Sequence, residues 1–223
     1  MLGWTVAAAL AGAVSVAELE KARDRQDRAA LDRLAGEFAA AAEKSPKEHG
    51  AQYRAALAHS YVAEIAIEVR DRNRARDAAE AGIRLAQQAV TLAPRDAEYH
   101  RILGTLCGQA VRDLMSGMKW GRCAQEEIDK AIELDPRSAI ARLGRGVGRY
   151  YLPPMFGGGV ENAIKDFEKA IELNPKLADA HLWLGIALRK AYRPGEARKA
   201  IARAIELNPN RVWAKQQLEK TPQ

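Results

Sequence analysis

A short phrase that ends in proline recurs four times in this chain, and this recurrence restricts the fold more than any other feature of the sequence. The copies are Ala89-Val-Thr-Leu-Ala-Pro94, Ala131-Ile-Glu-Leu-Asp-Pro136, Ala170-Ile-Glu-Leu-Asn-Pro175 and Ala204-Ile-Glu-Leu-Asn-Pro209. Successive prolines are 42, 39 and 34 residues apart. Periods of this length are typical of proteins built from stacked units, in which each unit packs mainly on its neighbours.

Each copy closes a segment with the periodicity of an amphipathic helix. The last one follows Ala197-x3-Ile201-x2-Ala204, and spacings of four and three residues place these side chains on one helical face. Equivalent spacings precede the other copies and begin at Gly82, Ala124 and Ala163. Each proline is predicted to end its helix, because proline lacks a backbone N–H and its ring clashes with the preceding turn.

A second helical phrase precedes these segments. It reads His181-x2-Leu184-Gly185-x2-Leu188 in the last unit and His100-x2-Leu103-Gly104-x2-Cys107 in an earlier one. Glycine inside a helix costs about 1 kcal/mol relative to alanine, so its recurrence requires a reason. We expect the facing helix to approach closely at these glycines, through Ala197 and Ala124.

The 34-residue unit made of these two helices resembles the tetratricopeptide repeat, whose pattern is W-x2-L-G-x2-Y…A-x3-F…P. The resemblance covers residues 95–209 well, although His181 and Leu188 stand where the family has aromatic residues. It implies an all-α fold, a right-handed superhelical solenoid of antiparallel helix pairs. Residues 18–94 look like divergent repeats, and residues 210–223 are expected to form a capping helix, with Trp213 over the open end, and a tail.

Two central units are longer than the family pattern, and we expect their extra residues to form loops on one face. The first expected loop, residues 114–123, contains Met118 and Trp120. The second, residues 150–161, contains Met155 and Phe156, and its prolines and glycines predict a shaped turn. These apolar side chains either fill gaps between helices or form an apolar lip beside a binding groove.

The charge pattern argues against a nucleic-acid partner. The formal net charge is +6, but acidic and basic residues alternate at helical spacing, as in residues 18–28 and 70–77. Such alternation is typical of solvated helix faces. Only 6% of the residues are aromatic, and no basic stripe with interleaved aromatic residues is present. We therefore expect no binding of nucleic acid.

Residues 1–17 contain no charged side chain, and a densely charged stretch follows from Glu18. Small residues at 15–17 are what signal peptidase requires, so one expectation is an exported protein cleaved before Glu18. An uncleaved membrane anchor and the apolar first helix of a cytosolic protein are the alternatives. Export would make the mature protein periplasmic or secreted.

No residue pattern indicates catalysis, a cofactor or a metal site. The triglycine at 157–159 lacks the lysine of a phosphate loop, and the four histidines lie far apart in the sequence. His100 and His181 occupy equivalent places in their units, where we expect them to pack in the core. The sequence therefore predicts that the protein is not an enzyme.

Cys107 and Cys123 lie on the expected facing helices of one unit. In the repeat geometry these two faces are neighbours, so a disulfide would be allowed, and an exported protein meets an oxidising compartment. Two buried free thiols are the alternative.

The segment Pro153-Pro154-x2-Gly157-Gly158 and the helix after it also resemble part of exported bacterial repeat proteins, including the T component of substrate-binding-protein-dependent (TRAP) transporters. That resemblance implies a periplasmic accessory protein that contacts another protein or an apolar ligand.

If the geometry of the repeat family holds, the first helices of the pairs form a concave face, on which this family usually takes a peptide. The lining would be apolar in the middle and basic at both ends, which suits an extended peptide or an amphipathic helix with acidic ends. The residues predicted on this face are Glu98, Arg101, Thr105, Gln109, Ile140, Leu143, Val147, Tyr150, Leu182, Ile186, Arg189 and Lys190.

The sequence thus predicts a module that binds a protein or peptide. The alternative is a carrier of a hydrophobic small molecule for a transporter, in which Met118, Trp120, Met155 and Phe156 would enclose one cavity. An open groove beside Leu143, Tyr150 and Ile186 would instead favour a peptide.

Overall fold

The computed structural model describes residues 15–222, which fold into eleven α-helices, one short 3-10 helix and no strand. The helices are α1 (Val16–Asp24), α2 (Arg28–Lys44), α3 (His49–Glu68), α4 (Arg72–Leu92), α5 (Ala97–Ala110), α6 (Leu114–Leu134), α7 (Ala139–Tyr151), η1 (Pro154–Phe156), α8 (Val160–Leu173), α9 (Ala178–Lys190), α10 (Pro194–Leu207) and α11 (Val212–Glu219). They form five antiparallel pairs, from α1 with α2 to α9 with α10, and α11 packs on the last pair. The predicted all-α solenoid is confirmed.

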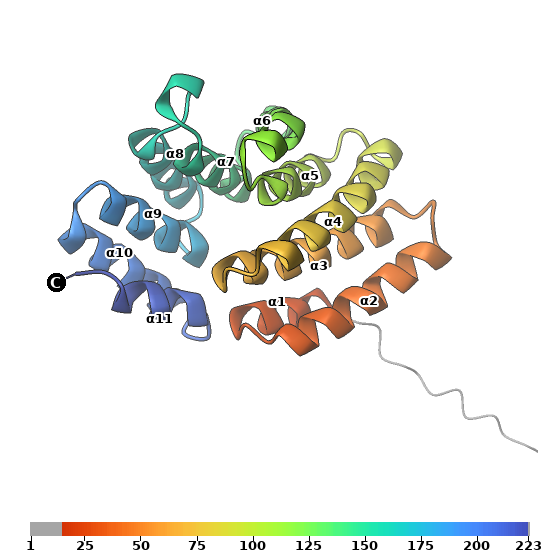
Figure 1. Ribbon diagram of the computed structural model, residues 1–223, viewed down its shortest axis with the longest axis horizontal. Coiled ribbons are helices and arrows are strands. Elements are labelled where there is room, and N and C mark those ends of the chain that lie inside the picture. Colours follow the sequence, from red (N-terminus) through yellow and green to blue (C-terminus); the bar gives the residue numbers. More distant parts are fainter. Residues whose placement is uncertain (1–14, 223) are drawn as a thin grey trace, which may run out of the picture.

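The pairs follow a strongly curved path. Figure 1 shows α5–α8 across the top of the arc, and α9–α11 returning to lie beside the ends of α1–α4. The two ends of the solenoid therefore meet, which the repeat pattern did not indicate.

The predicted signal peptide or anchor lies largely outside the described residues, because the description begins at residue 15. The predicted boundary before Glu18 falls in the first turn of α1, where Ser15 and Glu18 form a capping box. Among the helices of residues 15–222, none is long and apolar enough to span a membrane.

The second helix of each pair ends two residues before a proline, at Lys44, Leu92, Leu134, Leu173 and Leu207. The residue directly before each proline is extended, with ψ between 61° and 92°. A residue before proline avoids the α region because the proline ring crowds its backbone. The predicted helix ends are confirmed.

The recurrent glycines mark places where paired helices touch. A β-carbon at Gly185 would collide with Ile201 and lie 2.8 Å from the carbonyl oxygen of Ala197. One at Gly104 would lie 2.8 Å from Ile128 Cγ1 and 3.2 Å from the carbonyl oxygen of Ala124. The predicted close approach is confirmed, because only a residue without a side chain fits.

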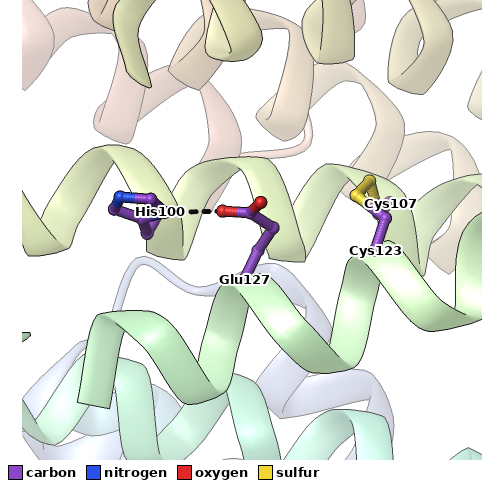
Figure 2. Close-up of a disulfide and its surroundings, with 4 residues drawn as sticks. All are labelled: His100, Cys107, Cys123 and Glu127. Carbon is purple, nitrogen blue, oxygen red and sulfur yellow. Dashed lines mark hydrogen bonds and ion pairs between the residues drawn. A yellow bond between two sulfur atoms is a disulfide. The ribbon is translucent and has the colours of Figure 1, made fainter. Parts of the chain in front are cut away.

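Each recurrent histidine is hydrogen-bonded to the turn that precedes its helix, at the carbonyl oxygen of a proline. His100 Nε2 donates to the Pro94 carbonyl oxygen at 2.9 Å, and His181 Nε2 donates to that of Pro175 at 3.0 Å. On its other side, His100 Nδ1 lies 2.6 Å from a carboxylate oxygen of Glu127 on α6 (Figure 2). His100 is buried as predicted, whereas His181 is only half-buried.

The prediction that residues 114–123 form a loop is wrong. Only residues 111–113 separate α5 from α6, and the extra residues lengthen α6 at its N-terminal end. Asp113 begins this helix, because its carboxylate accepts a hydrogen bond from the backbone N–H of Ser116 in a capping box. No proline lies in the segment to stop the helix.

The second expected loop exists between α7 and α8, with η1 at its tip. Gly157 and Gly159 have φ of 82° and 96°, which side chains rarely allow, and a β-carbon at Gly158 would collide with the Leu152 carbonyl. The N–H of Gly159 donates to the carbonyls of Arg149 at 2.8 Å and Leu152 at 2.9 Å. The triglycine therefore shapes a fixed loop.

Candidate functional site

The exposed apolar side chains of the described chain gather at the turns inside the helix pairs. Twelve large apolar side chains are exposed in residues 15–222, and all but Leu92 and Ile140 lie at or beside a turn that connects the two helices of one pair. Two consecutive pairs, α5–α6 and α7–α8, supply seven of them, which we call the turn patch: Val111, Leu114, Met115, Met118, Tyr151, Met155 and Phe156. Because the pairs stack on one another, their internal turns lie along the same edge of the solenoid.

One half of the turn patch is the overhanging start of α6. Cys107 on α5 is joined to Cys123 on α6 by a disulfide, with a Cα–Cα distance of 5.9 Å (Figure 2). Since α5 ends at Ala110, the first turns of α6 extend past it and leave Leu114 80% exposed. The disulfide thus pins α6 to α5 beside the overhang, and of the two alternatives that the sequence left open, a disulfide or two free thiols, the structure has the disulfide.

Trp120 fixes the same overhang from its inner side. Its half-buried ring packs against the apolar core of α1–α5, and Lys119 Nζ lies 4.4 Å from the ring centre. The interpretation of Trp120 as a gap filler is therefore correct, whereas Met118 on the same turn of α6 is exposed.

The other half of the turn patch is the loop between α7 and α8, which projects beyond the helix ends in Figure 1. At its tip, Met155 is 83% and Phe156 is 62% exposed. Asn162 Nδ2 donates to the Gly158 carbonyl oxygen at 2.9 Å and holds the loop to α8. These side chains do not fill gaps in the core, so the gap-filling interpretation is wrong for them.

The cavity predicted for a small-molecule carrier is not formed by its expected residues. Met118, Met155 and Phe156 face solvent and enclose nothing, and Trp120 lies against the core. The structure therefore gives the carrier alternative no enclosed site at these four side chains.

The predicted concave-face site is wrong for several of its apolar members. Leu143, Leu182 and Ile186 are buried in clusters that join consecutive pairs, with Leu182 only 1% exposed. Val147 and Tyr150 pack partly against the same clusters. The physical reason is the tight curvature, which brings successive first helices into contact and fills the expected groove with their own side chains.

The polar members of that predicted site are used inside the protein. Arg101 is buried and pairs with Glu98, which also accepts a hydrogen bond from the Tyr53 hydroxyl at 2.9 Å. Burial alone would raise the pKa of Glu98, but the charge and hydrogen bonds of Arg101 outweigh it and lower that pKa. These groups link α3 to α5 and are not presented to a ligand.

The remaining polar members likewise bond within the fold. Gln109 donates to the Ser60 carbonyl at 3.1 Å, and Arg189 donates to the Gln217 side chain at 2.7 Å. Lys190 is exposed but lies 4.2 Å from the ring of Tyr150. Thr105 is half-buried beside Arg101, and Ile140 is exposed. The structure does not bring the predicted residues together as one accessible groove.

Sequence comparison identifies repeats near the C-terminus. Residues 157–190 match the family described as TPR repeat, and residues 178–211 match the family described as tetratricopeptide repeat. No curated protein matches the chain in sequence.

Solved structures share the fold over most of the chain. A thermophilic TPR protein from Thermus thermophilus is 17% identical with a TM-score of 0.63, and the match covers 90% of this chain and 97% of that one. PilF of Pseudomonas aeruginosa is 18% identical with a TM-score of 0.50, over 76% of this chain and 68% of its own. Identities this low establish a common fold and nothing about a common ligand.

Proposed function

We propose that this chain, which belongs to the tetratricopeptide-repeat family, is a non-enzymatic module that binds a partner protein through the turn patch. The observation that carries this proposal is the exposure of large apolar side chains on two fixed projections of consecutive pairs. Large apolar side chains that gather in exposed positions on a protein mark interaction sites, because leaving them in water is unfavourable.

The kinds of side chain in the turn patch support a protein partner. All three methionines within residues 15–222 are exposed there, namely Met115, Met118 and Met155. Methionine is flexible and polarisable, so it adapts to the shape of an apolar partner surface. Phe156 and Tyr151 add aromatic area, which is enriched where binding energy concentrates.

The charges near the overhang balance one another. Arg112 and Lys119 flank the exposed apolar side chains of α6, but the exposed Asp113 follows Arg112 directly, and Lys119 Nζ lies 3.7 Å from a carboxylate oxygen of Glu80. We therefore infer a partner segment that is recognised mainly by its apolar side chains.

The disulfide supports the proposal that the protein works outside the cytoplasm. Bonds such as Cys107–Cys123 persist in oxidising compartments and are rare where thiols are kept reduced. We propose a periplasmic or secreted protein, with residues 1–17 as a signal peptide or, alternatively, a membrane anchor. The relation to TRAP accessory proteins remains a prediction.

Site-specific photo-crosslinking tests the proposed surface. A photoreactive phenylalanine analogue is placed at Met115 or at Phe156, and the purified protein is irradiated with an envelope extract of the native host. We expect both positions to capture the same partner, while Leu92, an exposed apolar residue outside the patch, captures none. Capture from Ile140 or Lys190 on the concave side, and not from the patch, would contradict the proposal.

Affinity measurements with the captured partner then test the individual side chains. The double variants Leu114→Ser/Met118→Ser and Met155→Ser/Phe156→Ser are each expected to weaken binding at least about tenfold, as central apolar contacts do. The matched control Leu92→Ser is expected to bind like the wild-type protein.

A further inference from the structure

The first half of α6 is attached to the rest of the protein by few contacts. The fully buried side chains of this helix lie in its second half, from Ile128 onward. Three half-buried side chains pack the first half against the core, namely Trp120, Cys123 and Ala124. The overhang, which comprises residues 114–121, therefore depends on a small number of anchors.

The overhang also has a low intrinsic tendency to form a helix. It contains Gly117 and Gly121, and glycine disfavours a helix because its backbone loses the most freedom there. Close packing does not require either glycine. A β-carbon at Gly121 would meet nothing within 4 Å, and one at Gly117 would lie in ordinary contact, 3.8 Å from Val111 Cγ1. Both glycines thus weaken a segment that could have been stronger.

The polar contacts of the overhang add little to its attachment. Lys119 pairs with Glu80 on α4, but both side chains are exposed, and exposed ion pairs contribute little to stability. Asp113 and Ser116 bond to each other within the first turn. The bond between Cys123 and Cys107 on α5 is therefore the strongest restraint on this part of α6 (Figure 2).

The disulfide opposes local unfolding of the overhang. It joins residues 16 apart and makes the chain between them a closed loop. A closed loop gains less conformational freedom on unfolding than an open segment does, so the bond favours the folded helix. Its reduction removes this restraint while the second half of α6 stays packed through Ile128.

The two sulfurs differ in their access to a reductant. Cys107 is 0% exposed, whereas Cys123 is only half-buried, so an external thiolate reaches Cys123 first. Its attack forms a mixed disulfide and releases Cys107 as a thiol. In a dithiol reductant of the Cys-x-x-Cys class, the second thiol then displaces Cys123 and leaves the reductant as a disulfide. Two electrons and two protons pass to the protein.

We propose that the Cys107–Cys123 bond is a redox switch for the turn patch, which rests on the function proposed above. In the oxidised protein the overhang is a fixed helix, and in the reduced protein it unfolds locally. The overhang supplies Leu114, Met115 and Met118 to the patch. A partner that binds the reduced form must first order these residues, and the loss of conformational entropy lowers its affinity.

Hydrogen exchange of backbone amides tests the structural step without a partner. The purified protein is compared before and after treatment with dithiothreitol. We expect the amides of residues 118–122 to exchange at least about tenfold faster after reduction, because local opening sets their rate. The amides of α10 serve as the internal reference and should change far less. Unchanged exchange in the overhang, or equal acceleration in α10, would overturn the proposal.

Alanine variants test whether weak helix formation causes the response. Gly117→Ala/Gly121→Ala strengthens the overhang without a clash, so the reduced variant is expected to keep slow exchange. Gly36→Ala, at an open position on α2, is the matched control and should respond to reduction like the wild-type protein. A full response in the double variant would contradict local unfolding as the mechanism.

Affinity for the partner captured through Phe156 tests the regulation itself. The reduced wild-type protein is expected to bind at least about tenfold more weakly than the oxidised protein, as when central apolar contacts are lost. Cys107→Ala/Cys123→Ala needs no reductant and should match the reduced protein. The reduced Gly117→Ala/Gly121→Ala variant should regain the affinity of the oxidised protein.

The outcomes separate this proposal from the proposed function. An affinity that does not depend on reduction would overturn the switch, even where Met155→Ser/Phe156→Ser weakens binding and so supports the turn patch. If that variant binds like the wild-type protein, the proposed function fails and the regulation of binding fails with it. The exchange measurement still shows whether the disulfide controls the overhang.

Discussion

Arg211 and Glu68 form a buried ion pair although 143 residues separate them in the sequence. The pair joins the turn before the last helix to the C-terminal end of α3. Its formation depends on the curvature of the whole stack of helix pairs, because each pair contributes a small rotation that brings the ends together. The stability of this protein should therefore respond to the ionisation of a few groups at one place.

The free energy of unfolding should fall as the pH rises from 5 to 8. Glu68 has a pKa of about 7 in the folded chain, so its contribution is fully present below the ordinary glutamate pKa and is lost through about pH 7. One such group changes stability by up to about 1.4 kcal/mol per pH unit. Urea unfolding of wild type and Glu68→Gln at both pH values checks this, and an equal slope in the variant would contradict it.

Alanine at two helical glycines should have opposite effects on stability. Gly185→Ala adds a methyl group against Ile201 and the Ala197 carbonyl, so we expect a net loss of about 1–2 kcal/mol. Gly36→Ala on α2 meets nothing within 4 Å and should stabilise by about 0.5–1 kcal/mol. Chemical denaturation of the two variants measures the difference, and a stabilised Gly185→Ala would mean that the helices can separate at little cost.

Breaking the disulfide should lower the free energy of unfolding by about 3 kcal/mol, the value expected for a closed loop of this length. The bond joins residues 16 apart, so its loss lets the unfolded chain gain entropy. Urea unfolding of the wild-type protein with reductant should match that of the double variant Cys107→Ala/Cys123→Ala. A wild-type protein insensitive to reductant would show that the bond does not form in solution.

Removing exposed side chains of the turn patch should leave folding intact. Met155→Ser and Phe156→Ser should each change the free energy of unfolding by less than about 0.5 kcal/mol, because both side chains are exposed. Trp120→Ala, in contrast, should cost about 2 kcal/mol or more, since its ring packs against the core. Thermal unfolding compares the three variants. A large loss of stability in Phe156→Ser would indicate that this side chain packs against the protein and is not exposed.

Features that depend on one helix or one pair of helices could be predicted from the sequence. The prolines ended the second helices at Pro94, Pro136, Pro175 and Pro209, because a helix cannot continue through them. The glycines marked the contact within each pair because the pattern repeats at a constant spacing. The same local geometry brings Cys107 and Cys123 together, although the sequence left a disulfide and two free thiols as alternatives.

Predictions that required the relation between pairs were less successful. The concave-face residues Leu143 and Leu182 have the right register for a groove, but neighbouring pairs bury them. The length of α6 was also missed, because the extra residues 114–123 could be read as a loop or as helix. Asp113, a helix-capping residue three positions before Ser116, was a signal that could have identified the longer helix.

The sequence by itself determined the solenoid, its helix pairs and the contacts within each pair. These follow from the short-range spacing of apolar, glycine and proline residues, which recurs in each repeat. Only the tertiary structure decided which surface is accessible. It buried most of the expected groove, left the turn patch exposed and brought Arg211 against Glu68. The physical reason is that small rotations between successive pairs add up along the chain, and their sum is set by side-chain packing between units and not by the repeated motif.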